Sequence, residues 1–126
     1  MTLAYDTNLT HRIIGLAMRV HTSLGPGLLE NAYERCLCHE LDRHDLPYAR
    51  QVDLPLAYGD VLLACGYRAD IIVREEVLLE LKSVEHILPL HESQLLTYLR
   101  LSRCRVALLL NFNTVSLKQG IRRRVL

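Results

Sequence analysis

The stretch 77-VLLELKS-83 decides the fold that we expect for this chain, because it is an apolar strand that carries two charges. Side chains alternate along a strand, so Glu80 and Lys82 share one face while Leu79 and Leu81 point to the other. Apolar residues on both faces are typical of a strand inside a sheet. The stretch therefore predicts a central strand with a carboxylate and an ammonium group close together on one side.

The polar residues before this strand predict its first partner. If residues 74–76 form a three-residue hairpin loop, Val73 pairs with Val77, and the same register places Asp70 directly opposite Glu80. Opposed Cβ atoms in a sheet lie about 4.5–5.5 Å apart. Two carboxylates that close repel each other, and burial increases the cost of keeping both ionised.

Two arrangements would neutralise this pair of carboxylates. Carboxylate oxygens on a rigid sheet suit a hard cation, so the pair predicts a site for Mg²⁺ or Mn²⁺. Alternatively, Arg68 and Lys82 neutralise Asp70 and Glu80 in a local network of ion pairs. These four residues alone leave both arrangements open.

The period of the apolar residues predicts the elements around this hairpin. The expected helices are residues 9–24, 28–44 and 90–101, and the expected strands are 50–58, 60–73, 77–84 and 105–113. The tail from residue 117 fits either an edge strand or a loop. The order α-α-β-β-β-α-β indicates an α/β (α+β) fold with a mixed central sheet of about four to five strands flanked by helices. A chain of 126 residues fits a single domain, residues 1–126.

A third acidic residue follows the helical period. Glu30 opens the second expected helix, and Leu37 and Leu41 return almost to the same line seven and eleven positions later. This stripe predicts that Glu30 points inward, where a metal would give it a partner. A favourable contact with the helix dipole is the simpler alternative for a Glu in a first turn.

Gln94 and Tyr98 lie four residues apart, so they share one face of the third expected helix. A glutamine that points into a core needs hydrogen-bond partners. A metal-bound water or a phosphate oxygen would serve, and so would a backbone carbonyl. His21, on the first expected helix, is a further residue that could approach such a site.

The net charge of +1 conceals an uneven distribution. Residues 1–98 carry eight Lys/Arg and fourteen Asp/Glu, whereas residues 99–126 carry seven Lys/Arg and no acidic residue. A basic end on an acidic body fits a phosphate-bearing partner held beside a metal site, and a solvated tail is the alternative. The arginines expected to contact a nucleic-acid backbone are Arg100, Arg103, Arg105, Arg122, Arg123 and Arg124.

Several classes of protein are disfavoured by the sequence. It contains no apolar run of the ~20 residues that a membrane span needs, and its first residues lack the pattern of a signal peptide. The four cysteines have no C-x-x-C spacing, which favours reduced thiols over zinc binding or disulfides. We therefore expect a cytoplasmic protein with no membrane partner.

The motifs, taken in order, resemble those of a known group of enzymes. Asp70, then Glu80-Leu81-Lys82, then Gln94-x-x-x-Tyr98 is similar to the pattern of the PD-(D/E)XK nuclease superfamily, and the Gln/Tyr pair to its RecB-like branch. The stretch 27-GLLENAY-33 resembles the motif of the GxxExxY protein family. The likeness spans roughly residues 9–124 and departs from the superfamily pattern at Ala69, where a proline is usual.

This resemblance implies a restriction-endonuclease-like core and a set of roles. Asp70, Glu80 and the Leu81 carbonyl would bind Mg²⁺ or Mn²⁺, with Glu30 binding directly or through water. Lys82 would orient or deprotonate the attacking water. The residues that would position the substrate are Gln94 and Tyr98, with Tyr33 of the GxxExxY motif and His21 as further candidates.

The function expected from these observations is metal-dependent hydrolysis of phosphodiester bonds in DNA, with RNA as a second substrate class. The alternative is a non-catalytic module that binds nucleic acid or assembles with proteins and has kept the nuclease fold. A homodimer is expected because a domain of this size offers limited surface to duplex DNA.

Overall fold

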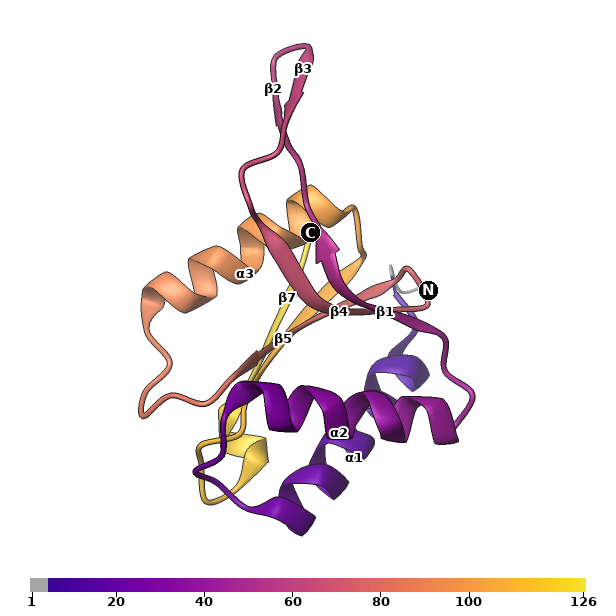
Figure 1. Cartoon of the computed structure of the whole chain (residues 1–126), viewed down its shortest axis with the longest axis vertical. Coiled ribbons are helices and arrows are strands. Elements are labelled where there is room, and N and C mark those ends of the chain that lie inside the picture. Colours follow the sequence, from indigo (N-terminus) through magenta and orange to yellow (C-terminus); the bar gives the residue numbers. More distant parts are fainter. Residues whose placement is uncertain (1–4) are drawn as a thin grey trace.

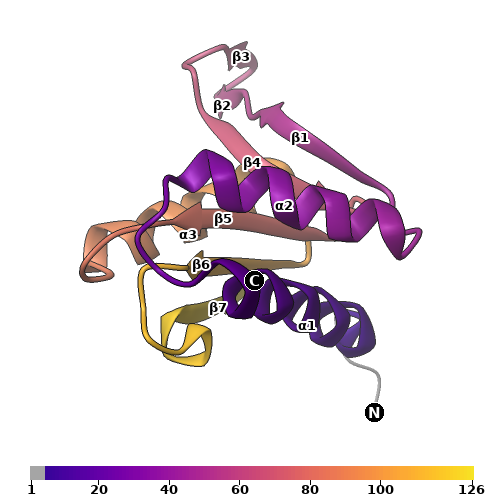
Figure 2. The same cartoon turned by 60° about the horizontal axis from the view of Figure 1, so that its bottom comes forward.

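A computed structural model describes residues 5–126, in which a five-stranded mixed sheet lies between two layers of helix. Two expectations involve residues 1–4, namely where the domain begins and that the chain lacks a signal peptide, and these lie outside the described residues. Figure 1 shows α1 and α2 together on one side of the sheet and α3 on the other, and Figure 2 shows the same layers from below. The predicted α/β architecture is confirmed.

The elements follow the predicted order, with two strands divided. The helices are α1 (Thr7–Leu24), α2 (Glu30–Arg43), α3 (Pro89–Ser102) and the short 3-10 helix η1 (Leu117–Gly120). The strands are β1 (Tyr48–Asp53), β2 (Leu56–Tyr58), β3 (Val61–Leu63), β4 (Arg68–Val73), β5 (Val77–Lys82), β6 (Val106–Asn111) and β7 (Ile121–Val125). Within residues 5–126, no helix combines the length and the apolar character that crossing a membrane requires.

The two strands expected at residues 50–58 and 60–73 are each interrupted. The first divides into β1 and β2 around Pro55, which has no N–H to donate to a ladder. The second divides into β3 and β4 before Arg68, and Gly66 in the break has a φ of 80°. Because of these breaks, β2 and β3 form a separate two-stranded sheet, which we call the arm.

The main sheet has the order β1-β4-β5-β6-β7, so β5 is central. The hairpin of β4 and β5 has the predicted register, with Val73 opposite Val77 and Ile71 opposite Leu79. β6 runs parallel to β5. The tail, which the sequence left as either an edge strand or a loop, forms the edge strand β7, antiparallel to β6. The start of β4 and the ends of β5 and β6 therefore lie at the same end of the sheet.

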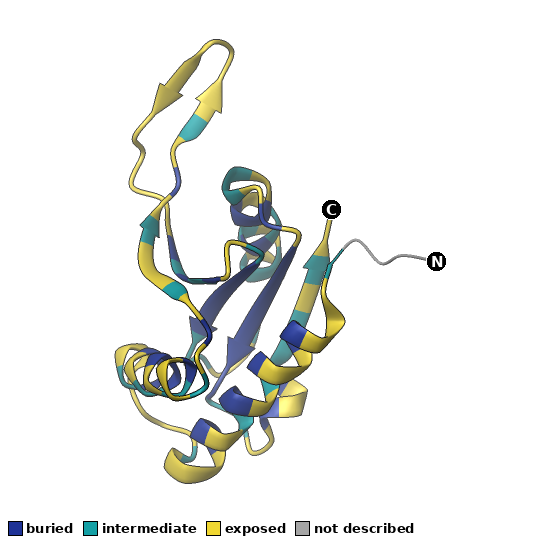
Figure 3. Ribbon diagram, turned by 90° about the vertical axis from the view of Figure 1, so that its right-hand side faces the viewer, coloured by how far each residue is buried: buried dark blue, intermediate teal, exposed yellow. Residues whose placement is uncertain are grey.

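Two clusters of buried residues hold the layers together. One joins α1 and α2 to side chains such as Leu79 and Leu108, and the other joins α3 to Leu78 and Leu109 on the opposite face. Figure 3 shows the resulting buried strands in the centre of the molecule. β5 and β6 are apolar on both faces because helices cover both, as their sequences predict.

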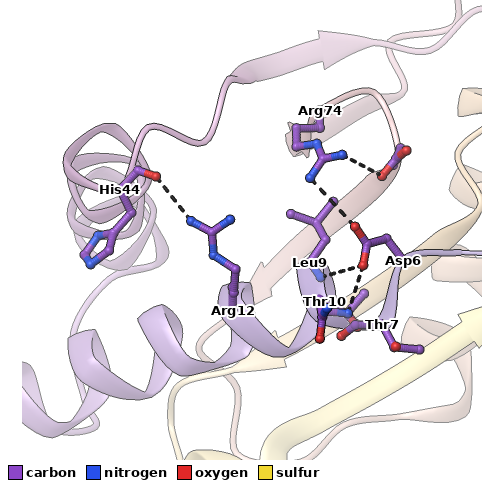
Figure 4. Close-up of polar contacts among 9 residues, drawn as sticks. Asp6, Thr7, Leu9, Thr10, Arg12, His44 and Arg74 are labelled. Atoms are coloured by element: carbon purple, nitrogen blue, oxygen red, sulfur yellow. Dashed lines mark hydrogen bonds and ion pairs between the residues drawn. The ribbon is translucent and has the colours of Figure 1, made fainter.

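Polar contacts fix the start of α1 against the hairpin turn (Figure 4). The Asp6 carboxylate accepts hydrogen bonds from backbone N–H groups of the first turn of α1, as a helix cap does. Arg74 lies 3.8 Å from Asp6 and 3.9 Å from Glu76, and Arg12 donates to the carbonyl of His44 at 3.3 Å. The first helix is thus tied at its start to both the hairpin and the end of α2.

Tyr33 fixes the loop that joins α1 to α2. Its hydroxyl donates to the Gly25 carbonyl at 2.6 Å and accepts from the Leu28 N–H at 3.1 Å, while its ring stacks on Phe112 at 4.4 Å. Gly27 has a φ of 97°, which a residue with a side chain rarely adopts. These contacts give Tyr33 a structural role; the substrate contact expected for it stays a prediction.

We expect Tyr33→Phe to lower the free energy of unfolding by about 0.5–1.5 kcal/mol, because it removes two part-buried hydrogen bonds that fix the loop. Urea denaturation followed by circular dichroism measures the change. Tyr58→Phe is the matched control, since Tyr58 is 74% exposed and should lose nothing. Equal midpoints for the two variants would contradict this role of Tyr33.

Candidate active site

Two carboxylates lie where the ladder between β4 and β5 ends. Beyond the pair of Ile71 and Leu79, the backbone groups bond to side chains instead of to each other. The N–H of Asp70 donates to Oε1 of Glu80 at 3.0 Å, and the N–H of Leu81 donates to Oδ2 of Asp70 at 2.8 Å. Figure 1 shows β4 continuing toward the arm while β5 leads toward the loop before α3. Asp70 and Glu80 therefore occupy the point where the two strands separate.

The surroundings of this pair disfavour ionisation. Glu80 is only 6% exposed, and its burial, followed by the charge of Asp70, raises its pKa to about 8. The pKa of Asp70 is also raised, first by burial. The charge of Lys82 acts against both shifts, which shows that its ammonium group lies near the two carboxylates.

The described residues do not form the direct ion pairs that the sequence left open as the alternative. Arg68 forms an ion pair with Asp53, at 3.2 Å, rather than with either buried carboxylate. Among the ion pairs of residues 5–126, none involves Lys82. Oδ1 of Asp70 and Oε2 of Glu80 accept no hydrogen bond from the described residues. The pair is thus held in place by backbone N–H groups, with the charge of Lys82 nearby but in no direct ion pair.

Sequence reasoning missed a third carboxylate, Glu34 on α2. Its side chain is buried, and its Oε2 accepts from Arg50 at 2.9 Å (Nε) and 2.6 Å (Nη2). Its Oε1 accepts from Gln51 Nε2 at 2.8 Å. The charge of Glu34 contributes to the raised pKa of Asp70, so the two acidic groups are close enough to interact.

A sequence signal for Glu34 existed. Leu37, Cys38 and Leu41 follow it by three, four and seven residues, which is the spacing of a single buried helix face. Glu30 lies one turn earlier and is exposed, so the expectation that it points inward is wrong. The buried stripe ends before it because Glu30 is the first residue of α2.

Glu30 still lies near the site. Its charge is among the causes that raise the pKa of both Asp70 and Glu80, although it is not the largest for either. Metal binding by Glu30 therefore stays a prediction.

Gln51 reaches Glu34 from an unusual backbone conformation. It is the β1 residue between Arg50, which pairs with Ile71, and Val52, which pairs with Ala69, so it lies level with Asp70. Its φ of 50° is uncommon for a residue with a side chain. Such conformations persist where surrounding contacts enforce them, and they gather at functional sites.

Gln94 and Tyr98 approach the carboxylates from the other layer. They share a face of α3, as predicted, and Gln94 Nε2 donates to the Tyr98 hydroxyl at 3.1 Å. Burial raises the pKa of Tyr98, and the charge of Glu80 raises it further, so the phenol lies within electrostatic reach of Glu80. The partner of Gln94 is thus a tyrosine, which was not among the partners expected from the sequence.

Comparison with protein families identifies this arrangement. The sequence model described as the PD-(D/E)XK nuclease superfamily matches residues 7–124, nearly the whole chain. The chain belongs to the PD-(D/E)XK nuclease superfamily. The curated proteins and the solved structures that were compared with it gave no match.

Within this superfamily domain, the exit of β5 is held by a buried residue that sequence reasoning did not single out. Asn111, at the end of β6, is level with Lys82. Its amide accepts from the Val84 N–H at 3.0 Å and donates to the Val84 carbonyl at 2.9 Å. Ser83 donates to the Leu28 carbonyl at 2.7 Å, so the chain after Lys82 is fixed on two sides.

His21 does not join this nuclease-like site. Its ring is buried, lies 2.8 Å from the Thr114 carbonyl through Nε2, and is 6.3 Å from the ring of Phe112. These contacts connect α1 to the loop after β6. Its expected role in positioning a substrate stays a prediction without support from its contacts.

The six arginines expected to contact nucleic acid are spread over the domain. Arg103 and Arg105 precede β6 and lie at the end of the sheet opposite to Lys82. The length of the strand, about 17 Å for five residues, separates them from Lys82. Arg124 forms an ion pair with Glu92. Of the others, Arg122 donates to two backbone carbonyls, Arg123 lies over the Tyr5 ring and Arg100 is exposed on α3.

The donor set fits a hard cation in part. Asp70 and Glu80 each offer one carboxylate oxygen that accepts no protein hydrogen bond, and such oxygens are the ligands that Mg²⁺ prefers. Within residues 5–126, however, no three His, Cys, Asp or Glu side chains gather closely enough to hold a metal ion by themselves. The structure therefore brings together two of the three acidic groups that we expected to converge.

The buried pair should make the stability of the metal-free protein depend on pH. Folded Glu80, with a pKa of about 8, keeps a proton that the unfolded chain loses near pH 4.5. The free energy of unfolding should therefore fall as the pH rises through this window, by a few kcal/mol at about 1.4 kcal/mol for each pKa unit.

We expect Glu80→Gln to remove much of this pH dependence, because the amide keeps an acceptor oxygen and never ionises. Thermal unfolding at pH 5 and pH 8, in the presence of a chelator, measures the change in stability with pH for each protein. The histidines also titrate between these pH values, but they contribute equally to wild type and variant, so their effect cancels when the two changes are compared. The same change in stability with pH for wild type and variant would contradict the raised pKa of Glu80.

Proposed function

We propose that this superfamily domain is a metal-dependent nuclease. The observation that carries the proposal is the pair formed by Asp70, which is half-buried, and Glu80, which is buried: the fold holds the two carboxylates side by side, and neither forms an ion pair within the described residues. Each carboxylate disfavours the ionised form of the other, and a cation bound between them would remove this cost. A bound divalent ion would restore both charges.

The metal site would consist of Asp70, Glu80 and the carbonyl of Leu81, with Mg²⁺ or Mn²⁺ as the ion. Glu30 would contribute through water, and Glu34 is close enough to act in the same way once its contacts with arginine and glutamine loosen. A divalent ion supplies a nucleophilic water at neutral pH and neutralises charge on the phosphate.

Lys82 follows Glu80 by two residues on the same strand and is half-buried. We propose that its ammonium group orients the attacking water and stabilises the negative charge that develops on the phosphate oxygens. Gln94 and Tyr98 would position the substrate from α3, where their mutual hydrogen bond fixes both polar groups.

The proposed substrate is DNA, with RNA as the second choice, and a cytoplasmic location fits either one. Membership of the RecB-like branch and of the GxxExxY family is part of this proposal and rests on the Gln94/Tyr98 pair and on the stretch from Gly27 to Tyr33. Arg100, exposed on α3, is the best placed of the predicted backbone contacts, because α3 also carries Gln94 and Tyr98.

One observation favours the alternative, a non-catalytic module that binds nucleic acid or another protein. Glu34, the buried helix carboxylate nearest to Asp70, is already neutralised by Arg50 and Gln51. If these contacts persist when divalent ions are present, only two acidic ligands remain. Measurements of metal binding and of cleavage therefore test separate parts of the proposal.

Metal binding should raise the melting temperature. We expect several degrees with Mg²⁺ or Mn²⁺ in large excess, since a hundredfold excess over Kd adds about 2.7 kcal/mol. Asp70→Asn should abolish the rise while leaving the metal-free protein as stable as wild type or slightly more so, because the repulsion is relieved. Differential scanning fluorimetry measures both effects, and an unchanged response in the variant would reject this metal site.

Cleavage should depend on Lys82. We expect Lys82→Ala to reduce cleavage of plasmid or single-stranded DNA at least about a hundredfold, which is typical for loss of a group that handles protons in the transition state. Lys118→Ala is the matched control, since Lys118 is the only other lysine and is exposed. Equal cleavage by all three proteins would remove the nuclease assignment.

A further inference from the structure

The arm carries a group of exposed apolar side chains on both of its strands. Tyr58 is 74% and Leu62 72% exposed, and Val61 and Leu63 are 46% and 43% exposed. The arm pairs only with itself, as β2 with β3, and stands clear of the domain in Figures 1 and 3. A two-stranded ribbon is marginally stable on its own in water, so exposed apolar side chains on both strands indicate a partner surface.

The same chain also carries an apolar groove that its own helices leave uncovered. This groove has a volume of about 710 Å³ and lies between β1 and the end of α3. Ala49, Val52 and Ile72 line it along the sheet, Cys104 lies across from them, and Arg74 marks one end. We call it the β1–β4 groove. The arm cannot cover it within one molecule, because the arm points away from the sheet.

We propose that two copies of this chain form a symmetric dimer in which the arm of each lies in the β1–β4 groove of the other. The two surfaces match in length: Gly59 follows Leu54 by five positions and Val52 follows Pro47 by five positions, so each stretch spans about 17 Å. A two-fold axis lets both arms bind at once, because the same pair of surfaces is used twice.

The charges of the arm bear on what it can bind. Asp60, at the tip of the arm, is the only charged residue between positions 54 and 67. Because the arm leaves from one end of the sheet and Arg74 lies at the other, an inverted partner brings the tip of its arm toward Arg74 and Glu75, whose opposite charges leave that end of the groove close to neutral. The lack of any Lys or Arg in the arm disfavours a nucleic acid as the occupant.

This proposal gives the expected homodimer a specific interface and does not depend on nuclease activity. Size-exclusion chromatography with light scattering on the full chain measures the mass in solution. We expect a dimer for wild type and monomers for Leu62→Glu in the arm and for Ala49→Glu in the groove. Both positions are exposed in the single chain, so circular dichroism should show folded variants. Val115→Glu, at a position that is 95% exposed and belongs neither to the arm nor to the lining of the groove, should remain dimeric.

Mixing the two monomeric variants provides the decisive test. The Leu62→Glu chain keeps a normal groove and the Ala49→Glu chain keeps a normal arm, so the mixture should recover dimers through one intact pair of surfaces. A monomeric wild type would overturn the proposal and leave the arm for another protein or a nucleic acid. A dimer lost in Leu62→Glu but kept in Ala49→Glu would overturn it in favour of pairing between arms. Loss of the dimer in all three variants would show non-specific association and would overturn it as well.

Discussion

The repulsion between Asp70 and Glu80 is the constraint on which the rest of the site depends. Each carboxylate accepts a hydrogen bond from a backbone N–H that has no partner in the ladder of β4 and β5, so neither carboxylate can move away without leaving an N–H unpaired. The pair is therefore fixed by the same hydrogen bonds that end the hairpin. Helices on both faces of β5 bury Glu80 and partly cover Asp70, which limits the hydration of both carboxylates.

The surrounding elements make this constraint rigid. Asn111 and Ser83 fix the chain where it leaves β5, and Tyr33 fixes the loop between α1 and α2. These contacts come from three separate parts of the chain, and each uses a polar side chain to satisfy backbone groups. A site built in this way has little freedom to rearrange, which suits a catalyst that must hold its ligands in place.

Much of the fold and half of the site followed from the sequence, because both depend on local periods. The alternation in β5 and a three-residue loop were enough to fix the register that brings Asp70 opposite Glu80. The spacing of four between Gln94 and Tyr98 fixed their common helix face. Pro55 and Gly66 marked the breaks that create the arm, but their presence does not say in which direction a broken strand continues.

The remaining site residues depend on contacts between distant elements. Glu30 and Glu34 lie one turn apart on α2, and although the helical period favours Glu34 as the buried residue, only the position of β1 gives it Arg50 and Gln51 as partners. The backbone conformation of Gln51 likewise has no local signal, since glutamine rarely adopts a positive φ. The basic residues of the last third looked continuous in the sequence, yet the parallel pairing of β5 and β6 places Arg105 far from Lys82.

The amide protons of Asp70 and Leu81 report directly on this part of the molecule, because their acceptors are titratable side chains instead of carbonyls. Protonating either carboxylate weakens its acceptor and should speed exchange of the corresponding amide with solvent deuterium, while the neighbouring amides of the ladder remain slow. The charge state of a buried pair can thus be followed from two backbone resonances, without a substrate and without turnover.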